Sequence, residues 1–143
     1  MNGAALVILV VEDNPGDVLL LTEAIAQTGI AARVHAVEDG EAALDFLVRR
    51  GDHAAAPRPG LIVLDLNLPI KSGREVLAEI MADPALHDIP VAVLTSSKAE
   101  SDVCDGYRKS RCRYFVKSGD FKELVDIVRR MEQFAWSERG DQA

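Results

Sequence analysis

The sequence predicts an α/β domain in which a five-stranded parallel sheet is covered by helices on both faces. Short apolar runs alternate with amphipathic segments, in five repeats of strand followed by helix. The runs 6–11, 61–64 and 91–94 are rich in Val, Ile and Leu, as is typical of strands buried on both faces. The more mixed runs 33–37 and 113–116 fit strands near the sheet edges. This alternation favours right-handed crossovers and helices on either side of the sheet.

Helix start and stop signals separate the first predicted strands. Asn14 before Pro15 is typical of an N-cap and a first helical position, and Gly29 is a stop signal. Asp39 is the cap of a second helix, which is expected to end near Gly51, before a Pro-rich loop.

The sequence signals for the next two helices differ in strength. Ser72 and Glu75 form a capping box for a third helix, which stops at Pro84. Residues 99–109 predict a weaker helix, because Gly106 and several Ser and Asp residues lower its helix propensity.

One domain is expected to fill the chain. Apolar residues recur at helical spacing over 121–131, which predicts the last helix. We expect residues 1–137 to form this domain, residues 138–143 to be a polar tail, and no output domain to be attached.

Composition excludes several classes of function. Of the 143 residues, 48% are hydrophobic and 27% are charged, and the net charge is -7. The acidic excess argues against nucleic acid as a partner, because basic side chains supply most of that affinity. No apolar run approaches the roughly 20 residues that span a bilayer, and the N-terminus has no signal-peptide pattern. We therefore expect a cytoplasmic protein with no membrane partner.

Cysteine usage agrees with that location. Cys104 and Cys112 lie eight residues apart, with no further Cys or His at metal-ligand spacing. The prediction is two reduced thiols.

Polar side chains follow four of the predicted strands. Glu12 and Asp13 follow the first strand, Asp65 the third, Thr95 the fourth and Lys117 the fifth. Ligands of open parallel sheets bind beyond the carboxyl ends of the strands, so these side chains are expected to meet at one edge. Each one alone fits a solvated turn or an edge charge; their joint placement predicts a site.

The chemistry of this set points to a phosphoryl group and a hard cation. Three close carboxylates repel one another unless a cation joins them, and oxygen ligands suit Mg²⁺. A lysine and a hydroxyl opposite that cation can hold phosphoryl oxygens. A carboxylate can attack phosphorus to form an acyl phosphate, and Asp65 is the best candidate because it follows the central strand and opens a loop.

The polar motifs form an ordered set with a tyrosine and a glycine: Glu12-Asp13, Asp65-Leu66-Asn67-Leu68-Pro69 with Gly73, Thr95-Ser96, Tyr114 and Lys117. This set resembles the receiver domain of two-component response regulators over about residues 5–136. The resemblance implies a flavodoxin-like (βα)5 three-layer fold with strand order 2-1-3-4-5.

The resemblance also implies roles for the acidic residues. Asp65 would accept a phosphoryl group from a phosphohistidine on a sensor histidine kinase. Asp13 and Asp65 would hold Mg²⁺ or Mn²⁺ directly, Glu12 would act through water, and Asn67 would act through its backbone carbonyl.

The remaining roles concern the response to phosphorylation. Thr95 and Lys117 would contact phosphoryl oxygens, and Tyr114 would move inward as Thr95 is drawn to the phosphate. The face formed by 99–109, 113–116 and the last helix would then change its arrangement. Such a protein signals through contacts with other proteins and is not an enzyme in the usual sense.

Two positions depart from the family pattern. Ser118 stands where receivers usually carry a proline in a cis bond, so the sequence leaves the Lys117–Ser118 bond open between cis and trans. Ser118 could also cap the last helix. Glu12 replaces the more frequent Asp, and its longer side chain should still reach a metal-bound water.

A narrower resemblance is to stand-alone regulators of phytochrome-type histidine kinases. It rests on four stretches: Asn14-Pro15-Gly16-Asp17, the loop 51–59, Asp83-Pro84-Ala85-Leu86 and Phe134-Ala135-Trp136. It implies a homodimer through the side of the fifth strand and last helix. Trp136 fits such an interface or packing on its own domain equally well.

Alternative functions remain open at this point. The chain could be a phosphorelay shuttle that passes its phosphoryl group to a further protein, or a protein-binding module of the same fold that is never phosphorylated. A phosphohydrolase would need an acid two residues after the nucleophile, where this chain has Asn67. No Gly-rich nucleotide-binding motif occurs.

Overall fold

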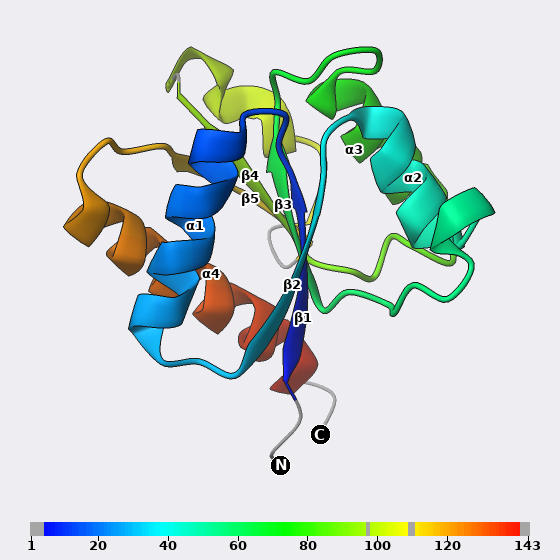
Figure 1. Cartoon of the computed structure of the whole chain (residues 1–143). Coiled ribbons are helices and arrows are strands. Elements are labelled where there is room, and N and C mark those ends of the chain that lie inside the picture. The colour runs from blue at the N-terminus through cyan, green and yellow to red at the C-terminus, as the bar shows by residue number, and fades with distance from the viewer. Residues whose placement is uncertain (1–4, 97, 109–110, 141–143) are drawn as a thin grey trace.

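The computed structural model describes residues 5–96, 98–108 and 111–140. Its five strands form one parallel sheet in the order β2-β1-β3-β4-β5, so the flavodoxin-like fold is confirmed (Figure 1). The strands are β1 Leu6–Val11, β2 Ala32–Val37, β3 Leu61–Asp65, β4 Val91–Thr95 and β5 Cys112–Val116. The helices are α1 Pro15–Thr28, α2 Gly40–Val48, α3 Gly73–Ala82 and α4 Phe121–Gly140, with short 3₁₀ segments η1 Gly51–His53 and η2 Lys98–Cys104.

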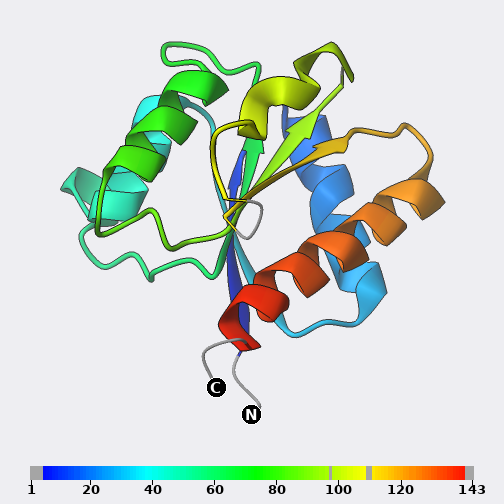
Figure 2. The same cartoon turned by 180° about the vertical axis from the view of Figure 1, so that it is seen from behind.

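Alternate residues of the strands build two separate cores. α1 and α4 contact each other on one side of the sheet, and α2 and α3 contact each other on the other (Figures 1 and 2). On β1, for example, Ile8 and Val10 belong to the α1/α4 core, whereas Leu9 and Val11 belong to the α2/α3 core. The three central strands are therefore covered on both faces, as their apolar sequences predict.

The predicted helix starts are confirmed by side-chain caps. The Asn14 side chain accepts from the Asp17 amide at 3.0 Å, and the Asp39 side chain accepts from the Ala42 amide at 2.7 Å. Both hydrogen bonds of the Ser72 capping box are present. These caps fix the helices next to the strand ends that carry the polar motifs. No helix in the described ranges is long and apolar enough to cross a membrane.

The segment after β4 differs from the prediction. The sequence predicts a weak helix over 99–109, whereas the structure has the 3₁₀ segment η2, whose backbone leaves helical geometry at Glu100. Lys109 lies outside the described residues. The low helix propensity of this segment agrees with a short 3₁₀ segment in place of a regular α-helix.

The last helix, α4, continues to Gly140 and so includes the first residues of the expected polar tail. Trp136 is half-buried against the α1/α4 core, and its indole N–H donates to Glu132 at 2.9 Å. Of the two readings of this residue, packing on its own domain is the one that the structure shows.

The prediction of two reduced thiols is wrong in the structure. Cys104 and Cys112 form a disulfide, with their Cα atoms 5.5 Å apart. The sequence shows only their spacing. The fold brings the end of η2 beside the start of β5, at a separation that a disulfide can bridge.

Gly73 is required by a close approach between α3 and the end of β3. A Cβ added there would lie 2.6 Å from the Leu66 Cα and would also meet the Asp65 carbonyl oxygen. The Gly73 amide donates to the Leu66 carbonyl at 3.1 Å, so the two segments cannot separate freely. Glycine therefore permits the loop geometry that presents Asp65.

We expect Gly73→Ala to lower the free energy of unfolding by about 1–3 kcal/mol, because overpacking forces the backbone apart. Gly119→Ala is a matched control, since a Cβ there meets nothing within 4 Å. The control should stay within about 0.5 kcal/mol of the parent chain. Urea denaturation measures both values, and equal stability of the two variants would contradict this account.

A candidate metal and phosphoryl site at the strand ends

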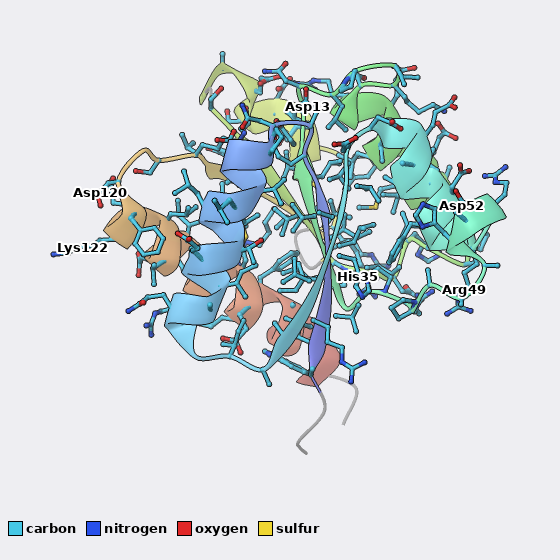
Figure 3. All side chains as sticks on the ribbon, in the orientation of Figure 1. Asp13, His35, Arg49, Asp52, Asp120 and Lys122 are labelled. Atoms are coloured by element: carbon cyan, nitrogen blue, oxygen red, sulfur yellow. A yellow bond between two sulfur atoms is a disulfide. The ribbon has the colours of Figure 1, made fainter. Side chains whose placement is uncertain are left out.

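Three carboxylates meet where β1 and β3 end. The parallel register pairs Val11 with Leu64, so the acidic residues that follow on the two strands are neighbours. One carboxylate oxygen from each of Glu12, Asp13 and Asp65 lies within 4.8 Å of the others. Glu12 and Asp65 are buried and Asp13 is exposed at the top of the sheet (Figure 3). The predicted convergence of these residues is therefore present.

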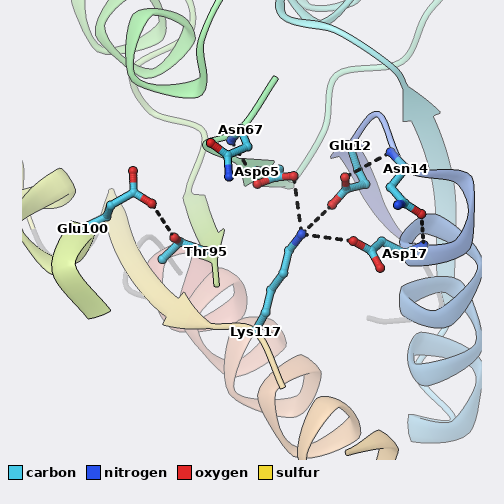
Figure 4. A network of polar contacts seen from close by, with 8 residues as sticks. All are labelled: Glu12, Asn14, Asp17, Asp65, Asn67, Thr95, Glu100 and Lys117. Atoms are coloured by element: carbon cyan, nitrogen blue, oxygen red, sulfur yellow. Dashed lines mark hydrogen bonds and ion pairs between the residues drawn. The ribbon is translucent and has the colours of Figure 1, made fainter. Parts of the chain in front are cut away.

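Lys117 follows the edge strand β5, and its side chain reaches this cluster. Its amide donates to the Thr95 carbonyl at 2.7 Å, which extends the pairing of β4 and β5 past their ends. From there its ammonium contacts Glu12 Oε1 at 2.9 Å, Asp17 Oδ2 at 3.3 Å and Asp65 Oδ2 at 3.4 Å (Figure 4). The lysine thus stands opposite the carboxylates, as the spacing of the motifs predicts.

Burial and charge shift the pKa values of this network. Burial, together with the neighbouring Asp65 charge, raises the pKa of Glu12 to about 7, although Lys117 and the Asn14 amide oppose that rise. Burial alone would lower the pKa of Lys117, but its hydrogen bond to Glu12 and the Asp65 charge outweigh burial and raise it. Lys117 is therefore charged at neutral pH, whereas the negative charges around it are incompletely compensated.

This donor set fits a hard divalent cation. Carboxylate oxygens are the ligands that Mg²⁺ prefers, and the open side at Asp13 leaves room for the waters it keeps. The cluster sets three carboxyl groups against one ammonium, that of Lys117, which contacts Glu12 and Asp65. Glu12, Asp13 and Asp65 are the residues that would hold such an ion.

Thr95 lies at the end of β4, as predicted, but its hydroxyl is hydrogen-bonded outside the carboxylate cluster. Its side chain is buried at the end of β4, and its hydroxyl donates to Glu100 Oε1 of η2 at 2.8 Å (Figure 4). Tyr114 lies opposite Val93 in the sheet pairing and is 39% exposed. The structure therefore places neither side chain in the carboxylate cluster.

The peptide bond between Lys117 and Ser118 is trans in the structure, since no peptide bond among the described residues is cis. The Ser118 hydroxyl accepts from the Asp120 amide at 3.1 Å and donates to Glu123 at 2.7 Å. Asp120 itself accepts from the Lys122 amide at 2.8 Å, so Asp120, rather than Ser118, is the cap of α4.

Sequence reasoning missed two contributors. Asp17 lies in the first turn of α1 and contacts Lys117. Glu100 lies in η2 and accepts the hydrogen bond of the Thr95 hydroxyl. A carboxylate in the first turn of a helix beside the predicted site was a signal for Asp17; no pattern in the sequence singles out Glu100.

The parallel sheet and its strand-end site are those of a response regulator receiver. Residues 8–129 match the model of the response regulator receiver domain, and the chain belongs to that family. Its members are signalling proteins. Among its relatives, response regulator Rcp1 of Synechocystis sp. is 46% identical over 132 residues, which cover 92% of this chain and 89% of that protein.

Solved structures agree with the sequence comparison. The phosphorylated cyanobacterial phytochrome response regulator RcpA matches with a TM-score of 0.81 and 43% identity, covering 94% of this chain and 96% of that one. The Mn²⁺-bound form of Rcp1 matches with a TM-score of 0.76 and 42% identity, covering 90% and 92% of the two chains. Receivers similar to this chain are thus known in a phosphorylated and in a metal-bound form.

Proposed function

We propose that this chain is a response regulator that accepts a phosphoryl group on Asp65 in a Mg²⁺-dependent reaction. The observation that carries the proposal is the meeting of three carboxylates with the Lys117 ammonium at one edge of the sheet. Asp65 is the acceptor because it alone among them belongs to the central strand β3 and also contacts Lys117. Mn²⁺ can replace Mg²⁺ at such an oxygen site.

Each side chain has a part in the transfer. An Asp65 carboxylate oxygen attacks phosphorus as the bond to the donor's histidine nitrogen breaks, which leaves an acyl phosphate on Asp65. Lys117 offsets charge on the phosphoryl oxygens, and Mg²⁺, when bound, would supply further positive charge there. Asp13 and Asp65 would hold that cation directly, Glu12 would act through a water molecule, and the Asn67 backbone carbonyl would be a further ligand.

The phosphoryl group then changes the contacts of Thr95. It adds about −1.5 to −2 charge near neutral pH and offers acceptor oxygens to the Thr95 hydroxyl. To reach them, Thr95 leaves Glu100, and the freed space favours an inward position of Tyr114. The face formed by η2, β5 and α4 changes with it and carries the signal to other proteins.

The partners follow from this reaction and from the relatives. The donor is a sensor histidine kinase, and likeness to phytochrome response regulators favours a phytochrome-type kinase. We place this reaction in the cytoplasm. Homodimerisation through the η2–β5–α4 face, and onward transfer to a further histidine protein, are compatible extensions of this function.

Acetyl phosphate tests the proposal without a kinase. With Mg²⁺ we expect intact-mass analysis to show an adduct of about 80 Da, the mass of one phosphoryl group, and hydroxylamine should remove it as it removes acyl phosphates. Chelation of divalent cations should abolish adduct formation. A chain that never gains the adduct would instead be a binding module, and an adduct of unchanged rate in the chelator would contradict the metal's part.

A further inference from the structure

The disulfide joins two elements next to the proposed site. Cys104 is the last residue of η2, and Cys112 is the first residue of β5. Cys112 is buried and Cys104 is partly buried, and both pack with the α2/α3 core. Their Cα separation of 5.5 Å lies in the usual range for a disulfide. The bond therefore fixes the end of η2 to the sheet.

The other contacts of η2 are modest. At its start, Glu100 accepts the hydrogen bond of Thr95. In its middle, Asp102 pairs with Arg74 at 3.1 Å, but both side chains are exposed, and exposed ion pairs contribute little. Val103 is buried in the core. A short 3₁₀ segment has weak internal hydrogen bonding, so contacts with the rest of the domain hold η2 in place.

We propose that Cys104 and Cys112 are a reversible thiol–disulfide couple that controls how readily η2 releases Thr95. In the oxidised form η2 is held at both ends, by Glu100 on Thr95 and by the disulfide on β5. In the reduced form its C-terminal end is no longer covalently joined to β5 and is held by the packing of side chains such as Val103. This proposal rests on the proposed function, in which Thr95 leaves Glu100 when Asp65 is phosphorylated.

The coupling follows from a shift in populations. Only chains whose Thr95 can leave Glu100 hold the phosphoryl group in the active arrangement. A covalent clamp on η2 lowers the fraction of such chains, and reduction raises it. Disulfides in reducing compartments are as a rule transient and redox-sensing. The proposal gives Cys104 and Cys112 this behaviour.

The redox step balances with a dithiol reductant such as dithiothreitol or a protein of the thioredoxin class. A reductant thiolate attacks the Cys104 sulfur, the more exposed of the two, and forms a mixed disulfide with it. Cys112 leaves as a thiolate and takes up a proton. The second reductant thiol then displaces Cys104, so the protein gains two electrons and two protons, and the reductant becomes a disulfide.

The first test is whether the couple is reversible. The full chain is equilibrated in buffers with different ratios of reduced to oxidised dithiothreitol, quenched with iodoacetamide and weighed. Both cysteines should become alkylated together over one transition, and reoxidation should reverse it. Cysteines that are alkylated in every buffer, or in none, overturn the proposal.

The second test is whether the bond restrains η2. Amide hydrogen exchange over 98–104 should become about tenfold faster on reduction, because local opening no longer works against the clamp. Exchange over β1 serves as the internal reference and should not change. Cys104→Ser in oxidising buffer should exchange like the reduced parent chain. Equal exchange over 98–104 in both redox forms overturns the proposal.

The third test separates this proposal from the proposed function. With acetyl phosphate and Mg²⁺, the reduced chain should gain the Asp65 adduct several-fold faster than the oxidised chain. Equal rates in the two forms overturn the coupling to phosphorylation. If neither form gains an adduct, the proposed function falls, and the exchange comparison over 98–104 still decides whether the disulfide is a redox-controlled clamp.

Discussion

Asp65→Asn is expected to abolish the phosphoryl adduct that acetyl phosphate and Mg²⁺ produce. The amide is a poor nucleophile, and it cannot form the acyl phosphate. The substitution also removes one of three clustered negative charges, which weakens the metal site. Intact-mass analysis over a time course measures the loss directly.

Asp17→Asn is the matched control for this variant. Asp17 also contacts Lys117, at 3.3 Å, but it is not among the three clustered carboxylates. The control should gain the adduct at close to the parent rate. Because the Asp65 charge helps to raise the pKa of Glu12, Asp65→Asn should bring that pKa nearer its ordinary value and leave the fold intact. An adduct at the parent rate in Asp65→Asn would place the acceptor elsewhere.

Lys117→Met is expected to impair both stability and phosphorylation. Its ammonium contacts Glu12, Asp17 and Asp65, so methionine leaves buried carboxylates without their cation. Removing one partner of a buried pair costs up to about 3–5 kcal/mol. We expect about 2 kcal/mol here, because Glu12 can take up a proton in response. The adduct should also form about a hundredfold more slowly, since a charge partner of the phosphoryl oxygens is lost.

The pKa of Lys117 sets the pH range of this effect. Because that pKa is raised in the folded state, the stabilising charge is complete below the ordinary lysine pKa and is lost only as pH rises through the raised value. Titration of Lys117 should therefore not remove the difference between Lys117→Met and the parent chain near neutral pH, whereas protonation of Glu12, whose pKa is about 7, should make it smaller as pH falls below 7. Urea denaturation without divalent cations measures it.

Lys71→Met is the control for Lys117→Met. Lys71 pairs with the half-exposed Glu79, outside the carboxylate cluster. Loss of such a pair should cost less than about 1 kcal/mol and leave the rate of adduct formation unchanged. Millimolar Mg²⁺ should restore part of the stability lost in Lys117→Met, because a cation again offsets the carboxylates. Equal stability of the two variants would contradict the role given to the Lys117 contacts.

Much of the fold was predictable because local signals agree with the global arrangement. The Asn14 cap, the Ser72 capping box and the apolar strands act over a few residues and are visible in the sequence. The meeting of Glu12, Asp13 and Asp65 was predictable for a similar reason. Strand ends of a parallel sheet share one edge, so the sheet order alone brings these residues together.

What the sequence could not predict depends on tertiary contacts. The disulfide requires the end of η2 to lie beside the start of β5, and nothing in the Cys104 and Cys112 spacing shows that. The contact between Glu100 of η2 and Thr95 of β4 also joins two elements in space, and no local pattern shows it. Receivers usually have a cis proline after this lysine, whereas this chain has Ser118, so the sequence could not decide between a cis and a trans bond. The structure has the trans bond.

The order of the site residues along the chain has a consequence for protein synthesis. All three clustered carboxylates come from the part of the chain that ends with β3, whereas Thr95 and Lys117 come from β4 and the segment after β5. A ribosome therefore completes the acidic cluster well before it adds the residue that neutralises it. A nascent chain that has been made only through α3 has the proposed acceptor, Asp65, but lacks Lys117. If the proposed function holds, the chain can be phosphorylated efficiently only after the second half of the sheet has been synthesised and has docked.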